Sequence, residues 1–174
     1  MLNDRADAYL LLKQLGATKR LLLHLQLVGD AADLLIAGYK RLGIPFDSKL
    51  VELGVAIHDI GKINYPAELD APGSLHESSG RAILLSQGVQ PKVAQCCVSH
   101  AAWDGPEVSF EELSVALADK LWKGKREAEL ELLVIDASSV KLGVERWDVY
   151  PQLDKLFESI AADATARINR SRKV

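Results

Sequence analysis

The chain has 174 residues, of which 48% are hydrophobic and 26% are charged. These values are typical of one globular domain that is long enough to bury a core of its own. The formal net charge of −3 gives no basis for general nucleic-acid binding, and no continuous apolar run approaches the length of a membrane span, so we expect neither partner.

Every predicted element is a helix, because apolar residues recur three and four positions apart, as they do on one helix face. In chain order, the expected helices cover residues 10–15, 19–42, 49–59, 74–88, 91–101, 109–122, 126–142 and 150–168. The apolar run 132–135 also fits a strand, but its Glu-rich N-terminal flank favours a helix. We therefore predict an all-α fold.

Local signals set several of these boundaries. Ser74 and Ser109 each have a glutamate three positions further on, and both fit capping boxes that open a helix. Residues 61–73 contain two prolines and are expected to form a loop. The stretch 147–151, which ends in a proline, is expected to break the chain before the last helix.

The cysteines and the first residues of the chain bear on its location. Cys96 and Cys97 are sequence neighbours and are poorly placed to form a disulfide with each other. We interpret both as buried, reduced side chains, which indicates a cytoplasmic protein. Asp4, Arg5 and Asp7 interrupt the region where a signal peptide would have its apolar segment.

Basic residues gather near the end of the last predicted helix. They are Arg167, Arg170, Arg172 and Lys173. Cations are favourable near a helix C-terminus, so we interpret these residues as a solvated helix end and not as a nucleic-acid contact.

The four histidines lie on or at the end of different predicted helices. They are His24, His58, His76 and His100. Asp59 directly follows His58 at the end of an apolar run, and Asp119 interrupts an apolar helix face. Taken singly, each histidine also fits a hydrogen-bonded core residue, and Asp119 fits a helix cap or a buried salt bridge. An isolated buried carboxylate is costly to dehydrate, so convergence on a metal ion explains the whole set.

This ordered set resembles the signature of the HD-domain metal-dependent phosphohydrolases. That signature is a histidine on one helix, a His-Asp pair ending a later helix, and an aspartate on a helix further on. The matching residues here are His24, His58 and Asp59 in HDIGK, and Asp119 in ALADK. The resemblance covers about residues 19–125 and implies a single helical HD domain over residues 1–174, with a helical extension from about 126 to 174.

His76 and His100 match two further positions found in the two-metal members of that family. The ligands that the resemblance implies are His24, His58 and Asp119 for one ion, and His76 and His100 for the other. Asp59 would bridge the two ions, and divalent Fe, Mn, Zn, Co or Ni suits such mixed ligands. The alternatives are a His76 that faces solvent at the start of its helix and a His100 that is only a helix-terminal cation, and either one would leave a mononuclear site.

The resemblance implies hydrolysis of a phosphate ester or anhydride, in a small nucleotide-like substrate, by metal-bound hydroxide. Asp59 and Lys62 are the candidate catalytic residues. Lys62 would also bind phosphate, and its alternative is an exposed loop lysine. The further candidates for substrate binding are Arg81, Lys123 and Trp103, the last of which also fits a packing role. Two other functions stay open, a non-catalytic signalling or ligand-binding module and a di-iron oxygenase.

Overall fold

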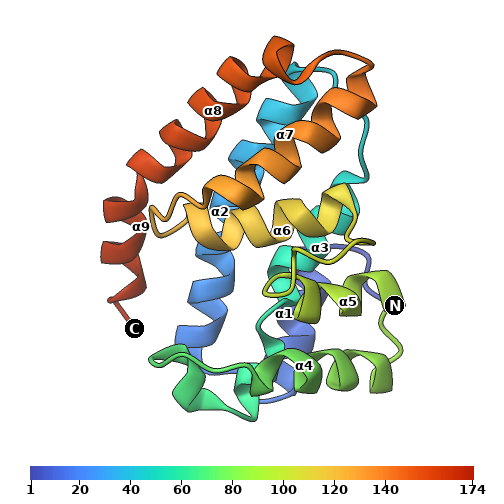
Figure 1. Ribbon diagram of the computed structural model, residues 1–174. Helices are drawn as coiled ribbons and strands as arrows, with labels where there is room; N and C mark the ends of the chain where they lie inside the picture. The colour runs from blue at the N-terminus through green and yellow to red at the C-terminus, as the bar shows by residue number, and fades with distance from the viewer.

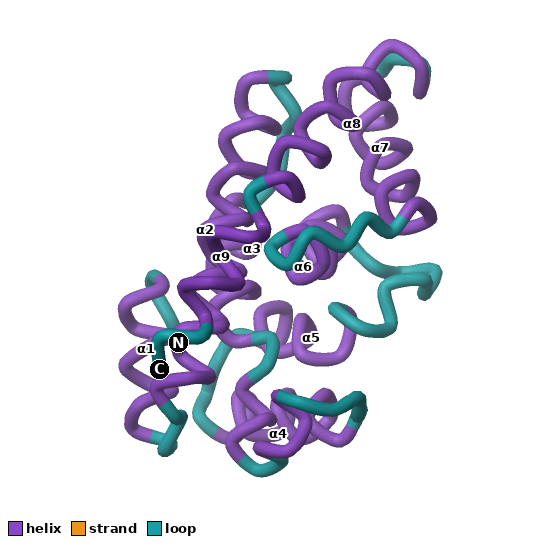
Figure 2. The backbone as a smooth tube through the Cα atoms, turned by 90° about the vertical axis from the view of Figure 1, so that its left-hand side faces the viewer, coloured by secondary structure: helices purple, strands orange, loops and turns teal.

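The computed structural model describes residues 1–174, and it contains helices, turns and loops without any strand (Figure 2). The α-helices are α1 (Arg5–Gln14), α2 (Lys19–Arg41), α3 (Ser48–Ile57), α4 (Leu75–Ser86), α5 (Pro91–Ser99), α6 (Phe110–Leu121), α7 (Ala128–Leu142), α8 (Arg146–Ala162) and α9 (Ala164–Ser171). Two short 3-10 helices, η1 (Ile60–Ile63) and η2 (Pro66–Leu69), lie in the segment predicted to be a loop. The predicted all-α fold class is confirmed.

Helix α3 lies at the centre of the bundle. It contacts α1, α2, α5 and α6, while α4 packs on α5, and α7 and α8 form a pair packed beside α6 (Figure 1). The sequence of α3 is apolar on nearly all sides, and Val51 and the stretch 53–57 are buried. This burial carries His58 and Asp59, which follow α3 directly, into the interior of the protein.

A continuous hydrophobic core extends from Leu2 before α1 to Ile160 in α8. Cys96 and Cys97 belong to this core as free thiols, so their predicted burial is confirmed. The Cys97 thiol also donates a hydrogen bond to the carbonyl oxygen of Ile57, at 3.5 Å, which ties α5 to the end of α3.

Helix α2 is long and apolar enough to cross a membrane when it is judged by length and composition alone. Polar residues interrupt α2 at intervals, so the sequence of this helix contains no long uninterrupted apolar run although its mean hydropathy is high. In the bundle, Leu25, Val28 and Leu35 of α2 are fully buried, and core helices pass the same test. The composition of α2 is therefore weak evidence for a membrane span.

One of the two predicted capping boxes is present. At the start of α6, the backbone N–H of Glu112 donates to the Ser109 hydroxyl at 3.2 Å, and the backbone N–H of Ser109 donates to the Glu112 carboxylate at 2.9 Å. The box predicted at Ser74 is wrong, because the side chain of Ser74 makes no cap hydrogen bond. The Glu68 carboxylate from η2 caps α4 instead, since a negative charge is favourable at a helix N-terminus.

The predicted break at Pro151 is also wrong. Helix α8 begins before this proline and includes it, and its first turn is closed by a hydrogen bond from the Glu145 N–H to the Asp148 carboxylate, at 3.1 Å. Pro151 is the sixth residue of α8, where it removes one backbone donor, and the helix continues through it. The chain breaks at Asp163 instead, between α8 and α9.

The backbone of η1 packs directly against the backbone of α4. A Cβ on Gly61 would lie 1.9 Å from the carbonyl oxygen of His76 and 2.8 Å from the backbone nitrogen of Gly80. A Cβ on Gly80 would lie 3.1 Å from both the Gly61 nitrogen and the Cys97 sulfur. The missing side chain of Gly61 therefore allows the approach that places His76 beside the His58–Asp59 pair.

Replacing Gly61 by alanine is expected to lower the free energy of unfolding by about 2 kcal/mol or more, because the added methyl group overlaps backbone atoms of α4. Gly105→Ala is the matched control, since a Cβ there meets no atom closer than 3.5 Å. Urea denaturation of both variants measures the difference. Equal loss of stability in the two variants would contradict this interpretation of the contact.

Candidate metal centre

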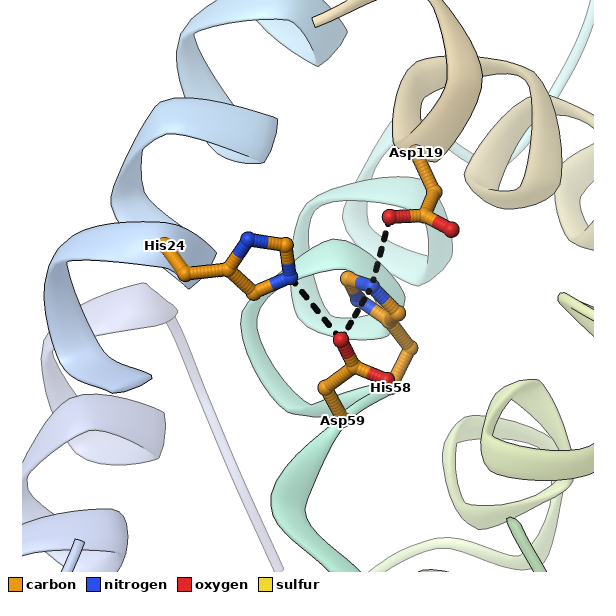
Figure 3. A group of neighbouring side chains, drawn as sticks. All are labelled: His24, His58, Asp59 and Asp119. Atoms are coloured by element: carbon orange, nitrogen blue, oxygen red, sulfur yellow. Dashed lines mark hydrogen bonds and ion pairs between the residues drawn. The ribbon is translucent and has the colours of Figure 1, made fainter. Parts of the chain in front are cut away.

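Four predicted ligands from three separate helices converge on one point (Figure 3). His24 lies on α2, His58 and Asp59 end α3, and Asp119 lies on α6. The Nε2 of His24 lies 2.8 Å from the Oδ2 of Asp59, and the Nε2 of His58 lies 3.4 Å from the Oδ1 of Asp119. These four residues offer ligand atoms that all lie within 4.8 Å of one another, close enough to hold one metal ion.

A second group meets the other oxygen of the same aspartate. The Nε2 atoms of His76 and His100 lie 3.2 Å and 3.5 Å from the Oδ1 of Asp59. Both histidines are buried, at 5% and 6% exposure, so the alternative of a solvent-facing His76 is wrong. Asp59 thus belongs to both groups of potential metal ligands, with one carboxylate oxygen toward each.

Backbone carbonyls fix how two of the imidazoles are protonated. The Nδ1 of His58 lies 3.0 Å from the carbonyl oxygen of Val55, and the Nδ1 of His100 lies 3.1 Å from that of Cys96. A carbonyl can only accept, so each Nδ1 carries the hydrogen, and in the neutral ring each Nε2 presents a lone pair to the site. This is the arrangement that histidine needs in order to bind a metal.

Three atoms of the cluster are buried without any hydrogen-bond partner. They are the Nε2 atoms of His58 and His76 and the Oδ1 of Asp59. Buried polar atoms are costly when they are left unsatisfied, and native proteins contain few of them. All three belong to the two groups of potential ligands and are of the kinds that ligate metals, so the residues present fit bound divalent ions.

Glu68 is a site residue that the sequence analysis missed. Its Oε2 lies 2.5 Å from the Nδ1 of His76 and also accepts the backbone N–H of His76 at 3.0 Å. A carboxylate in this position orients a ligating imidazole and increases its basicity. Glu68 lies in the segment predicted as a loop, and only the folded chain brings it to the start of α4.

The charges in the cluster shift one another's proton affinity. Burial by itself would raise the pKa of Asp59, but the neighbouring His58, His24 and His76 hold it well below its usual value. Burial opposes protonation of His58 and His76, yet the adjacent carboxylates outweigh it and raise the pKa of both above 6.5. Burial and the nearby His58 lower the pKa of His100 to about 4. The cluster therefore contains an ionised Asp59 and a neutral His100 at neutral pH.

The cluster borders a cavity of about 990 Å³. Five of the predicted ligands line it, namely His24, Asp59, His76, His100 and Asp119. The cations in its lining are Arg20, Lys62, Lys120, Lys123, Lys125 and Arg172. The lining thus combines metal-ligand side chains with cations, and this combination suits an anion that also contacts metal.

The predicted substrate-binding residues divide into two pairs. Lys62 and Lys123 line the cavity. The Nζ of Lys62 lies 2.8 Å from the Oδ2 of Asp59, and its side chain is only 13% exposed, so the alternative of an exposed loop lysine is wrong. Arg81 is exposed on α4 and Trp103 packs against the core, and neither lines the cavity.

Trp122 is the tryptophan that lies in the cavity wall. Its ring meets that of His24 edge-on, with the ring centroids 5.1 Å apart. It lies three positions after Asp119, on the same side of the chain at the end of α6, and this spacing was a signal in the sequence for its place beside the site. Trp122 therefore helps to fix the ring of His24.

Comparison with models of known protein families, with curated proteins and with solved structures finds no match to this chain. The helical fold with its His/Asp cluster is compatible with an HD-domain fold. The function of the chain therefore has to be inferred from the geometry of the site.

Metal binding is expected to strengthen as the pH rises, because His58 and His76 must be neutral to bind metal and their pKa values lie above 6.5. Asp59 is already ionised and His100 already neutral, so neither adds to this dependence. Calorimetry with Mn²⁺ in buffers of different ionisation enthalpy should show more proton release near pH 6 than near pH 8. Binding without proton release near pH 6 would contradict the assignment.

Glu68→Ala is expected to weaken the binding of one metal ion by about 10- to 100-fold, because His76 loses the carboxylate that orients it. The loss of the cap of α4 should also lower the free energy of unfolding. Glu77→Gln is the control, since Glu77 lies in the same helical turn and lines the cavity without touching the His76 ring. Metal titrations that give two unchanged affinities in Glu68→Ala would contradict this role.

Proposed function

We propose that this protein is a metal-dependent phosphohydrolase of the HD-domain type, which binds two divalent ions and cleaves a phosphate ester or anhydride of a nucleotide-like substrate. The observation that carries the proposal is the position of Asp59, whose two carboxylate oxygens face two separate groups of histidines. A carboxylate can bind one cation with each oxygen, whereas a neutral imidazole has a single free lone pair.

Each group of ligands would hold one ion. The first group contains His24, His58 and Asp119, the second contains His76 and His100, and Asp59 joins them. Mixed imidazole and carboxylate ligands favour Fe, Mn, Zn, Co or Ni over calcium or magnesium. Two such ions, when bound, supply a water of lowered pKa and neutralise charge on the attacking and leaving oxygens.

The side chains around the cluster supply binding and orientation. Lys62 lies against Asp59, where its ammonium group can contact a phosphate oxygen beside the ligand cluster. Lys123 supplies a further positive charge in the cavity wall. Trp122 and Glu68 hold the rings of His24 and His76 in place, so that the ligands are oriented before the substrate binds.

The two alternative functions make different demands on the site. A non-catalytic module has no need of a complete ligand set, and all six candidate positions converge here. A di-iron oxygenase would use the same ligands but has no need of a cavity lined by cations, which suits a phosphorylated substrate. Oxygen uptake by the iron-loaded protein, measured beside phosphodiester hydrolysis, separates the oxygenase from the hydrolase.

Asp59→Ala is expected to lose turnover and to retain less than one metal ion per chain, because both groups of ligands lose their shared carboxylate. Elemental analysis of the gently purified protein gives the metal content. Hydrolysis of bis(p-nitrophenyl) phosphate and of a nucleotide panel, with Mn²⁺, Co²⁺ or Ni²⁺ added, gives the activity.

Asp70→Ala is the matched control for this experiment. Asp70 also lines the cavity, but it pairs with Arg20 and belongs to neither group of ligands. The control should retain its metal. Normal turnover in Asp59→Ala, or wild-type protein that binds no divalent ion, would overturn the proposed function.

A further inference from the structure

Helix α9 holds the last residues of the chain against the cavity. The Nη2 of Arg170 lies 2.6 Å from the Oδ2 of Asp30 on α2, and Arg167 is 4% exposed with its Nη1 donating to the carbonyl oxygen of Ile160 at 2.7 Å. The interpretation of this basic group as a solvated helix end is therefore wrong for Arg167, whereas Arg170 is exposed and pairs with Asp30 at the surface. Helix α9 packs on α2 and α8, and residues 171, 172 and 174 at its end line the cavity.

The loop after α6 meets α9 closely and brings further cations to the same cavity. Gly124 has φ +81°, and a Cβ added to it would lie 2.9 Å from the Cβ of Ala164 at the start of α9. Lys123 and Lys125 flank this glycine, and Lys120 lies one turn earlier, at the end of α6. All three lysines line the cavity together with Arg172.

The cations of the cavity differ in whether a carboxylate already neutralises them. Arg20 pairs with Asp70, Lys62 lies 2.8 Å from Asp59, and Lys125 lies 3.7 Å from Glu127. The three cations that form no ion pair are Lys120, Lys123 and Arg172. Unpaired like charges that face one cavity repel each other, and a bound anion would relieve this repulsion.

We propose that Arg172, together with Lys120 and Lys123, forms a subsite for a second anionic group of the substrate, separate from the group that contacts the metal ligands. This inference rests on the proposed phosphohydrolase function and narrows its substrate class to molecules with at least two separated phosphates or a phosphate and another anion. Arg172 is the specificity-determining residue, because its guanidinium group can form two parallel hydrogen bonds to one phosphate.

A pair of phosphonates whose C–P bonds are stable to hydrolysis tests the subsite. Phenylphosphonate has one anionic group, and benzene-1,3-diphosphonate has a second on the same ring. Calorimetry on the metal-loaded full chain should show tighter binding of the diphosphonate to the wild type. Arg172→Ala should weaken diphosphonate binding by about fivefold, as expected for a partly exposed charge pair, and change phenylphosphonate binding by less than about twofold.

Lys173→Ala is the matched control. It removes one positive charge from the position next to Arg172, and Lys173 does not line the cavity. It should leave both affinities unchanged. The subsite is overturned if the wild type does not prefer the diphosphonate, if Arg172→Ala binds it normally, or if Lys173→Ala weakens it equally. Metal content is measured on the same samples, and a wild type that holds metal and hydrolyses phosphodiesters without the preference refutes the subsite alone.

Discussion

The buried charge of Asp59 is the constraint on which the rest of the site depends. An ionised carboxylate that is 2% exposed is tolerated only where positive charge or hydrogen-bond donors surround it. The imidazoles of His24, His58 and His76 and the ammonium group of Lys62 provide that environment here, and the neutral ring of His100 lies beside them. The helices are arranged accordingly, because α2, α3, α4 and α5 each end or pass where one of these groups can reach the carboxylate.

The same constraint explains why one short helix is so apolar. Helix α3 is surrounded by four other helices, and its burial is what takes the His58–Asp59 pair out of water. Close packing at Gly61 and Gly80 then fixes α4 against the end of α3, so His76 reaches the carboxylate from the other side. The positions of the two histidine groups thus follow from backbone packing and do not rely on flexible side chains alone.

The sequence predicted the helical class, the positions of α2 to α6 and all six clustered side chains, because apolar periodicity and the ordered His and Asp residues are visible in a single chain. It did not predict the cap by Glu68, because no local pattern links a glutamate in an irregular segment to a later helix. It also failed at Pro151, where helix α8 begins with a capping contact between Glu145 and Asp148 and continues through the proline.

Local sequence patterns likewise did not predict which cations line the cavity. Arg172 lies far along the chain from His24, and only the packing of α9 on α2 brings them to one cavity. Arg81 and Trp103 lie near ligands in sequence but point elsewhere in the fold. Proximity along a helix indicates a site residue only when the direction of the side chain agrees, as it does for Trp122.

Helix α2 carries both a candidate ligand, His24, and the residue that anchors α9, Asp30. A helix turns by about 100° per residue, so these two side chains keep a fixed angular offset around one stiff rod. Inserting or deleting a single residue between them would rotate the anchor away from its arginine while the histidine stayed in place. The length of this stretch of α2 is therefore part of the geometry of the cavity, although none of its intervening residues needs to touch a ligand.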